Sequence, residues 1–400
     1  MLSEIASGIG IFGNGLVGYL IPFLFVLTVV VFFHELGHFM IARLCGVKVL
    51  TFSIGFGPEI AGFYDRYNTR WKISAIPLGG YVKFFGDDNA ASVADASEVE
   101  KMTEAEKNVS FHHQPVRSRA AIVAAGPIAN FILAIVIFAG VFMIYGKPSS
   151  TARVDSIQED GVAASAGFRA GDVVVSIDGR EIESFADMQR VVSTSAGKRL
   201  DIVVDRGGVK VPLSATPALR EVKDNFGNVH RIGVLGITRS MSPQEQTMQP
   251  VNPAKAVWMG AQETWFIIDR TLAYLGGVVA GQESGDQLGG PGRIAQVAGQ
   301  VWQSGFSNGG VSVALAGLLH LTAVLSVSIG LLNLFPVPLL DGGHLMFYAI
   351  ETVRRRPLSE RSQEFGFRIG LALVTLLMIF AIYNDGRFVV WPLLRNLAPS

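Results

Sequence analysis

Four long apolar runs divide the chain into membrane-spanning and polar parts. Residues 16–33 are almost wholly apolar, residues 120–146 carry no charge, and residues 311–335 and 365–383 form two further runs. A helix that spans the roughly 30 Å hydrocarbon core of a bilayer needs about 20 such residues. The fourth run is the shortest, and its Arg368 can snorkel to the interface. The pattern therefore predicts an α-helical polytopic membrane protein with four transmembrane helices.

The segment between the first two runs has two different patterns. Residues 47–86 are rich in aromatic and β-branched residues around the polar turn YDRYNTR, which predicts a β-hairpin. Because this hairpin is so apolar, we expect it to lie against the bilayer. Residues 87–110 are acidic and small, so they are predicted to be flexible. His112 and His113, which follow in polar surroundings, are predicted to be solvated.

Residues 150–215 have the pattern of a compact α+β module. ARVDSIQ and DVVVSIDG alternate like strands, SFADMQRVVSTS is helix-like, and RLDIVVDRGGVKVPLSA predicts a hairpin around a Gly-Gly turn. The order of these pieces, with AGFRAGD before VVVSIDG, resembles a PDZ domain of the bacterial type. That resemblance implies peptide binding at a sheet edge, with Gly167 and Phe168 as substrate-binding residues. An unrelated small β-rich domain is the alternative.

The next segment, residues 216–310, is predicted to be a linker and one helix. Residues 216–256 are polar and interrupted by proline, so we expect little core there and no second PDZ domain. Residues 256–281 alternate at roughly helical spacing and contain three charged residues. The pattern favours an amphipathic helix at the outer membrane interface. A core helix of the outer domain is the alternative.

The distribution of charge predicts the orientation in the membrane. Residues 43–119 hold ten Lys and Arg, and the short connection 354–368 holds five. Short loops with many Lys and Arg remain in the cytoplasm, whereas long domains cross largely regardless of charge. Both termini and the PDZ segment are therefore predicted to face outward. The net charge is zero, so no nucleic acid partner is expected.

The first apolar run contains the motif HELGH at residues 34–38. Ionisable residues are costly inside a bilayer and are usually functional. His34 and His38 share one face of a helix and can bind one cation, and Glu35 is placed to act as a general base on water. The motif predicts a zinc site of the metalloprotease kind. Two histidines bonded within a helix bundle are the alternative.

A catalytic zinc needs a third protein ligand and one open position. Asp341 follows the third apolar run in NLFPVPLLDGG. Because the first and third spans run in the same direction, Asp341 and the two histidines are expected toward the cytoplasmic side. His344 is the alternative ligand. Cys45, the single cysteine, is expected to be a small buried apolar residue.

Three motifs together resemble the site-2 protease family of intramembrane zinc metalloproteases: HELGH in the first span, AAGPIANF in the second and NLFPVPLLDGG after the third. The PDZ insertion makes the chain similar to the group of the bacterial regulator of sigma-E protease, although that group carries two tandem PDZ domains. The resemblance implies one Zn²⁺ per chain, held by His34, His38 and Asp341, with Glu35 as the catalytic base.

The resemblance also implies substrates and a location. It implies substrate contact by Asn130 and Asn333, although such amides also bond backbone groups freed by nearby prolines. The substrates would be single-pass transmembrane proteins, such as anti-sigma factors or signal-peptide remnants, in a bacterial inner membrane. The hairpin would offer them an edge strand, and the PDZ domain would bind peptide termini or exclude bulk. A scaffold with a structural metal and a metal transporter are the competing functions.

These features predict seven parts along the chain. They are the first transmembrane helix at 1–46, the membrane-associated β-hairpin and flexible loop at 47–118, the second transmembrane helix at 119–146, the PDZ domain at 150–215, the linker and amphipathic helix at 216–310, the third transmembrane helix with its LDG motif at 311–353, and the fourth transmembrane helix with the C-terminal tail at 354–400.

Overall fold

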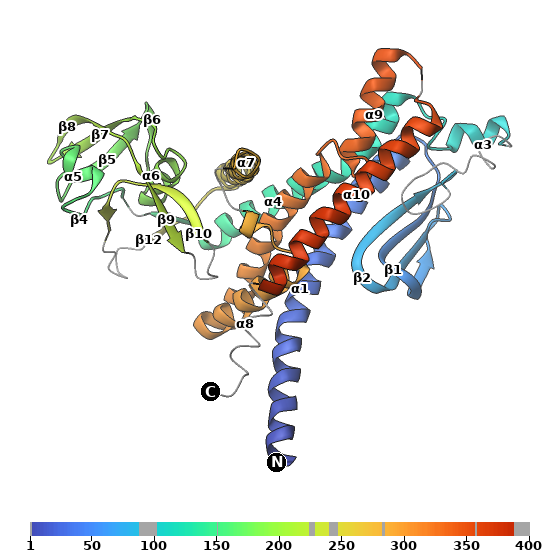
Figure 1. Cartoon of the computed structure of the whole chain (residues 1–400), viewed down its shortest axis with the longest axis horizontal. Helices are drawn as coiled ribbons and strands as arrows, with labels where there is room; N and C mark the ends of the chain where they lie inside the picture. The colour runs from blue at the N-terminus through green and yellow to red at the C-terminus, as the bar shows by residue number, and fades with distance from the viewer. Residues whose placement is uncertain are drawn as a thin grey trace. The chain divides into compact units, whose positions relative to one another are not determined.

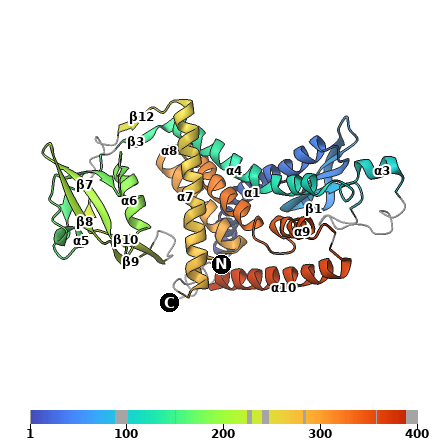
Figure 2. The same cartoon turned by 90° about the horizontal axis from the view of Figure 1, so that it is seen from above.

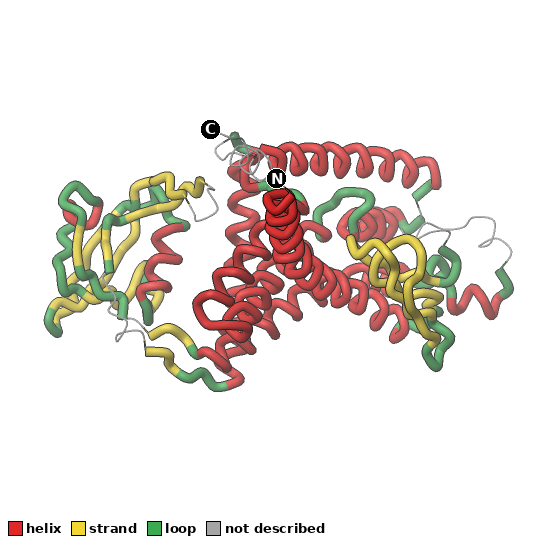
Figure 3. Tube along the Cα trace, turned by 90° about the horizontal axis from the view of Figure 1, so that it is seen from below, coloured by secondary structure: helices red, strands yellow, loops and turns green. Residues whose placement is uncertain are grey.

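The computed structural model describes residues 2–87, 102–149, 151–223, 229–239, 247–281, 285–356 and 358–387. The chain divides into two compact units. The larger unit consists of Met1–Phe138, Met259–Thr271 and Leu288–Ser400, and the smaller unit of Ala139–Trp258 and Leu272–Gln287. Strands occur in one hairpin of the larger unit and in the smaller unit, and the rest is mainly helical (Figure 3).

Four helices of the described residues are long and apolar enough to cross a membrane. They are α1 (Leu2–Leu44), α4 (Val116–Tyr145), α8 (Pro291–Asn333) and α10 (Glu360–Asp385). The four predicted spans are therefore confirmed as helices. In the larger unit α1, α4 and α8 lie side by side (Figures 1 and 2).

Helix α8 is two helices joined by a sharp turn. Gly309 and Gly310 are not helical, and Gly310 has a φ of 71°, which favours glycine. A Cβ on Gly305 would lie 2.6 Å from the Cα of Ala314. Residues nine apart in a straight helix are roughly 13 Å apart, so the two limbs pack against each other.

The first limb of α8 corrects the predicted organisation of residues 216–310. Residues 291–308 form no linker, because they pack on α1 through small residues. A Cβ on Gly299 would lie 1.9 Å from the ring of Tyr19, so only glycine permits this approach. Its start is held by Asp385 at the end of α10, whose carboxylate accepts hydrogen bonds from the N–H groups of Gly290 and Gly292 at 2.8 Å each.

The predicted third part, residues 311–353, contains a break. After Asn333 the chain leaves the helix, and α9 (Asp341–Arg354) begins as a separate helix with Leu340 as its N-cap residue. Two prolines in NLFPVP remove backbone donors at this point. Asp341 is therefore the first residue of a new helix.

The predicted hairpin is present as β1 (Val49–Tyr64) and β2 (Arg70–Phe84), with a more folded register than a simple ribbon. Residues 51–54 have partners near both ends of β2: Thr51 lies opposite Lys83 and also opposite Arg70. The first half of β1 is thus enclosed by two stretches of β2. Phe52 and Val82 bury their side chains against α1 and α4.

The turn between the two strands is tied to the end of α1 by one aspartate. Asp65 accepts hydrogen bonds from the Arg43 guanidinium, the Trp71 indole and the N–H groups of Tyr67 and Thr69. Partial burial raises the pKa of Asp65, but these four donors outweigh it and hold the pKa at about 2. The hairpin is anchored by its polar turn as well as by its core.

The segment after the hairpin is partly ordered. Residues 88–101 of the predicted flexible loop lie outside the described residues. Residues 104–109 form α3 (Glu104–Val109), with a capping box between Thr103 and Glu106, so this part of the predicted loop is helical. His112 is not solvated as predicted, because its Nε2 lies 2.9 Å from the fully buried carboxylate of Asp87.

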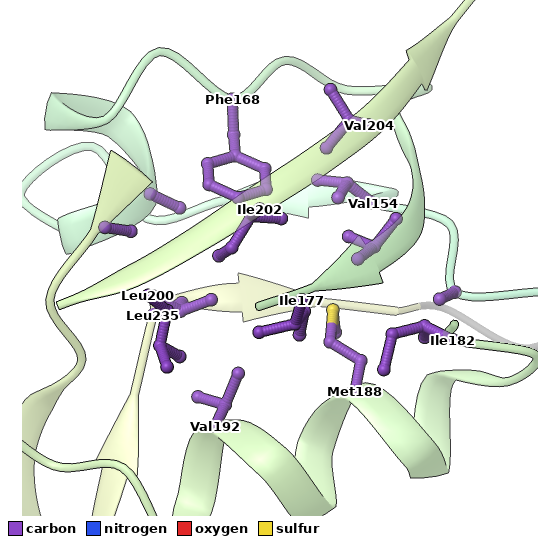
Figure 4. Close-up of a cluster of buried hydrophobic side chains, with 14 residues drawn as sticks. Val154, Phe168, Ile177, Ile182, Met188, Val192, Leu200, Ile202, Val204 and Leu235 are labelled. Carbon is purple, nitrogen blue, oxygen red and sulfur yellow. The ribbon is translucent and has the colours of Figure 1, made fainter. Parts of the chain in front are cut away.

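The smaller unit contains an α+β module with a four-stranded sheet in the order β6-β5-β7-β8. Its elements are β3 (Lys147–Ser149), β4 (Ser156–Ile157), α5 (Val162–Ser165), β5 (Val173–Ile177), β6 (Arg180–Glu181), α6 (Phe185–Ser193), β7 (Leu200–Arg206), β8 (Val209–Ala215), β9 (Ala218–Lys223), β10 (Val229–Val234), β11 (Ile237–Thr238) and β12 (Thr247–Gln249). Side chains from the sheet, α6 and the loops form its core (Figure 4). The α+β prediction is confirmed.

The module extends beyond the predicted boundary at residue 215. β9 pairs with β10, and β11 pairs with β4. Leu235 is 3% exposed and belongs to the core, so a linker at 216–256 is wrong. The polar residues that suggested a linker lie in the β9–β10 ribbon. Much of this ribbon is exposed, including its apolar residues Leu219 and Val222.

Helix α7 (Pro253–Val279) confirms the helix predicted at 256–281. Asn252 caps it by accepting a hydrogen bond from the N–H of Lys255. Trp258 and Trp265 are exposed along it. Its position at a membrane interface stays a prediction. A short 3₁₀ turn, η2 (Gly285–Gln287), follows.

Candidate metal centre

Helix α1 brings the two histidines of HELGH together one turn apart. The Nε2 atoms of His34 and His38 lie 3.3 Å from each other, and the two rings meet nearly at right angles. Both rings are mostly buried, with 12% and 11% of their side chains exposed. Two imidazole nitrogens this close repel each other through their lone pairs unless a proton or a cation lies between them.

Asp341 completes a group of three possible ligands. Its Oδ2 lies 3.3 Å from His34 Nε2, and its Oδ1 lies 3.6 Å from His38 Nε2. One ligand atom from each of the three residues lies within 4.8 Å of the others, and the described residues contain no other such group of three or more. The structure thus brings together the three residues that the sequence singled out.

The break before α9 positions Asp341. The two glycines that follow it pack against backbone: a Cβ on Gly342 would lie 2.2 Å from the carbonyl oxygen of Leu334, and one on Gly343 would lie 2.4 Å from that of Val337. Leu339 adopts a φ of 122°, a strained value for a branched side chain. The two glycines of the motif LDGG therefore allow the first turn of α9 to pack closely against the backbone that follows α8.

The donor set fits a divalent cation such as zinc. The Oδ2 of Asp341 is buried and accepts no hydrogen bond among the described residues, and such an oxygen is costly to leave unpaired. Two imidazoles and one carboxylate are ligands that zinc accepts, and three protein ligands leave a fourth position open. A bound cation would pair the Asp341 oxygen and remove the repulsion between the imidazoles.

Helix α4 supports the histidines from behind. The Nδ1 of His38 donates to the carbonyl oxygen of Ile122 at 2.9 Å. A Cβ on Gly126 would lie 2.2 Å from His38 Nε2, so glycine is required for the close approach. Metal-binding histidines commonly donate their second ring N–H to such an oxygen.

Glu35 faces a cavity beside these three residues. The cavity has a volume of about 220 Å³ and is lined by the histidines, Glu35, Asp341, Asn333 and the end of β2. Glu35 is hydrogen-bonded to the backbone of Val82, and a Cβ on Gly80 would lie 3.1 Å from Glu35 Cγ. The carboxylate predicted to be the base thus shares one space with the metal ligands and with a strand.

The two predicted substrate-binding asparagines occupy different environments. The Asn333 amide lies 3.3 Å from His34 Nε2 and lines the cavity. Asn130 is 0% exposed, and its amide lies 3.2 Å from His34 Nδ1, on the far side of the ring. Asn130 thus lies behind the His34 ring and outside the residues that line the cavity, and substrate contact by Asn130 stays a prediction.

His344 and Cys45 are not part of the three-residue group. His344 lines the same cavity and packs against Phe367, with 5.6 Å between the ring centroids. Cys45 is partly buried beside the apolar cluster under the hairpin. The partly buried His112 pairs with the fully buried carboxylate of Asp87, and the sequence carried no motif for this pair.

The predicted peptide site at Gly167 and Phe168 is wrong. Phe168 is 5% exposed and lies in the module core (Figure 4). The backbone N–H groups of Gly167 and Phe168 already donate to the carbonyl oxygens of Ala164 and Ala163, respectively. A groove of about 180 Å³ lies elsewhere, between α6 and residues 232–237. The repeated apolar pattern of RIGVLGI was the available signal.

Comparison with known proteins agrees with this geometry. Residues 22–377 match Peptidase family M50. Two relatives are named "Putative zinc metalloprotease". The one from Agrobacterium fabrum is 46% identical to this chain over 370 residues, and the one from Mesorhizobium japonicum is 47% identical over 369 residues. Each alignment covers 92% of this chain, and 96% and 98% of the relative. "Metalloprotease MmpA" of Caulobacter vibrioides is 40% identical over 94% of this chain and 98% of its own.

Two solved structures are similar to part of the chain. Both are PDZ domains of SdrC-like proteins, from Listeria monocytogenes and Listeria innocua, at 22% and 24% identity. They cover 23% and 22% of this chain, and 88% and 92% of their own chains, each with a TM-score of 0.18.

The family match covers most of the sequence, including α1, α4, α8 and α9, which contribute the three possible ligands and their supports. The three relatives align with this chain over nearly their whole length. This chain is a multi-pass membrane protein that belongs to Peptidase family M50, a family of zinc metalloproteases.

Proposed function

We propose that this protein is an intramembrane zinc metalloprotease of the site-2 type, with one Zn²⁺ per chain. His34, His38 and Asp341 would hold the ion, and Glu35 would be the catalytic base. The observation that carries the proposal is the unpaired Asp341 oxygen among two imidazoles, in one cavity with Glu35. Three ligands with one open position are typical of a catalytic site, whereas a structural zinc uses four.

When bound, zinc polarises a substrate carbonyl and makes water a nucleophile near neutral pH. Glu35 accepts the proton of the attacking water and then delivers it to the nitrogen of the leaving peptide. The Val82 backbone holds the Glu35 carboxylate at the cavity. Asn333, whose amide faces the same cavity, donates a hydrogen bond to the scissile carbonyl oxygen.

The substrates of this proposal are single-pass membrane proteins, such as anti-sigma factors or signal-peptide remnants. A helical substrate hides its carbonyls in internal hydrogen bonds, so it must unwind before it is cut. Residues 80–82 of β2 border the cavity beside Glu35. An extended substrate would pair with this strand and present its carbonyl to the centre.

The inserted module would select substrates through their ends, as a PDZ domain does. Its groove is lined by Met188 and Val192 of α6 and by residues 232–237. A helix facing a strand is the arrangement in which a peptide adds to a sheet edge. The bacterial inner membrane, with this module and both termini on the outer side, is the proposed location.

A cleavage assay with a matched control tests the proposed activity. Purified protein in liposomes would be incubated with a single-pass substrate, and Glu35→Gln compared with Glu104→Gln, whose side chain is 89% exposed. We expect Glu35→Gln to lose about 10²- to 10⁴-fold in rate and Glu104→Gln to keep the wild-type rate. Full cleavage by Glu35→Gln contradicts the proposal. Zinc binding without any cleavage by the wild type favours the scaffold function.

A further inference from the structure

Helix α4 presents three residues to the two histidines at intervals of four. Ile122 offers its carbonyl oxygen to His38, Gly126 leaves space for both rings, and Asn130 reaches His34. Residues i, i+4 and i+8 lie along one face of a helix. The same face thus contacts the outer nitrogen of each imidazole, with a main-chain group at His38 and a side chain at His34.

Asn130 is held firmly in this position. It is 0% exposed, and its own carbonyl oxygen accepts a hydrogen bond from the Ser326 hydroxyl of α8 at 2.9 Å. The Nδ2 of Asn130 lies 3.2 Å from His34 Nδ1, while Oδ1 is buried without a partner among the described residues. Rotation by 180° about the last side-chain bond exchanges the oxygen and the nitrogen of an amide, and this brings Oδ1 to the ring.

The two orientations of the amide have opposite consequences for His34. If the NH₂ group donates to Nδ1, the ring proton lies on Nε2, which then cannot bind a cation. If the oxygen accepts from Nδ1–H, the lone pair of Nε2 points toward Asp341 and His38, which lie 3.3 Å from it. Neutral imidazole has one proton for its two nitrogens, so the partner of one nitrogen decides the state of the other.

We propose that Asn130 is a positioning residue of the metal centre, whose amide oxygen accepts the Nδ1–H of His34 and thereby fixes the ring in its metal-binding tautomer. This inference rests on the proposed function, because it assumes that His34 binds zinc through Nε2. It gives His34 the same kind of support that the Ile122 carbonyl gives His38. Such outer partners typically change metal affinity by 10- to 100-fold when removed.

The test compares two substitutions of Asn130, one that removes the hydrogen-bond acceptor and one that keeps an acceptor oxygen, although the latter also adds a carboxylate charge. Leucine has a similar size and no acceptor, whereas aspartate keeps an acceptor at the same place. Zinc affinity would be measured on the full-length protein in detergent by competition with a chelator, together with the visible spectrum of the Co²⁺-loaded protein. Ser326→Ala is the control for packing at the same site, because the Ser326 hydroxyl donates to the main-chain carbonyl oxygen of Asn130 and not to its side-chain amide.

We expect Asn130→Leu to weaken zinc binding by about 10- to 100-fold and to alter the Co²⁺ spectrum. Asn130→Asp should remain within about threefold of the wild type, and Ser326→Ala within about twofold. Wild-type affinity in Asn130→Leu overturns the inference, and so does an equal loss in the leucine and aspartate variants, which indicates packing alone. If the wild type itself binds no zinc, the proposed function fails before this inference is reached.

Discussion

Two partly buried aspartates in the larger unit differ in how their oxygens are paired. Asp65, at the hairpin turn, accepts hydrogen bonds from four donors of its own chain. Asp341 has the same exposed fraction of its side chain, 18%, yet one of its oxygens has no hydrogen-bond donor among the described residues. A carboxylate that the chain satisfies stabilises the fold, whereas one that the chain leaves unsatisfied beside two imidazoles needs a cation.

The largest expected effect is a difference in zinc binding between substitutions of the two aspartates. Asp341→Asn should weaken zinc binding by more than about 100-fold and abolish detectable cleavage, because an amide oxygen carries no charge for the ion. Asp65→Asn should bind zinc like the wild type, since the hairpin turn holds no ligand. Zinc content after gel filtration measures both. Equal zinc content in the two variants would end the distinction between the sites.

The second effect tests how closely α4 must approach the centre. In Gly126→Ala the new Cβ would lie 2.2 Å from His38 Nε2 and 2.9 Å from His34 Cε1, so the helices must separate. We expect at least about tenfold weaker zinc binding and a loss of roughly 1–3 kcal/mol in stability.

Gly140→Ala is the control for this second effect, because its Cβ would meet nothing within 4 Å on the same helix. It should leave zinc affinity unchanged and stabilise the helix slightly. Identical behaviour of the two glycine variants would show that α4 does not need this close contact.

The third effect is on folding rather than on metal binding. A pKa lowered from 3.8 to about 2 corresponds to roughly 2 kcal/mol of stabilisation by Asp65 at neutral pH. Asp65→Asn should therefore lower the melting temperature in detergent by several degrees. Asp201→Asn, with a side chain that is 80% exposed, should stay within about 0.5 kcal/mol. An unchanged melting temperature in Asp65→Asn contradicts the role given to the turn.

The smallest expected effect is the pH dependence of the difference in melting temperature between the wild type and Asp65→Asn. Because the pKa of Asp65 is lowered in the folded state, its stabilisation is complete above pH 3.8 and is lost as the pH falls toward about 2. The gap in melting temperature between the wild type and Asp65→Asn should narrow across this range. Melting curves of the metal-free protein at several pH values between 5 and 2.5 measure it. A gap that stays constant would mean that the carboxylate charge is not what stabilises the turn.

Much of the site was predictable because three of its residues lie close together in the sequence at helical spacing. His34, Glu35 and His38 follow from helical geometry, and Asp341 follows from the shared direction of two spans. The burial of Asn130 was not predictable, because the sequence does not show which face of the helix carries this amide into the core. Phe168 was misassigned for the same reason: a glycine-aromatic turn reads alike whether its ring is a core residue or borders a groove.

The fold was predictable where hydrophobicity is continuous and less so where small residues control the packing. Four apolar runs specified four helices, since a bilayer allows few other structures. Residues 291–308 escaped prediction because glycines such as Gly299 bring helices together by lacking a side chain, and an absent side chain leaves no hydrophobic signal. The module boundary was misplaced because Leu235 reaches the core from a ribbon that is otherwise polar.

By itself, the sequence determined the kind of protein this is: a chain of membrane helices with a metal-binding motif in the first of them, because period and hydrophobicity act locally. Only the tertiary structure decided which polar groups are satisfied. It paired Asp65 with four donors and left Asp341 with an open oxygen, and it turned Asn130 toward the back of His34. Those outcomes depend on contacts between residues far apart in the chain, which no local pattern records.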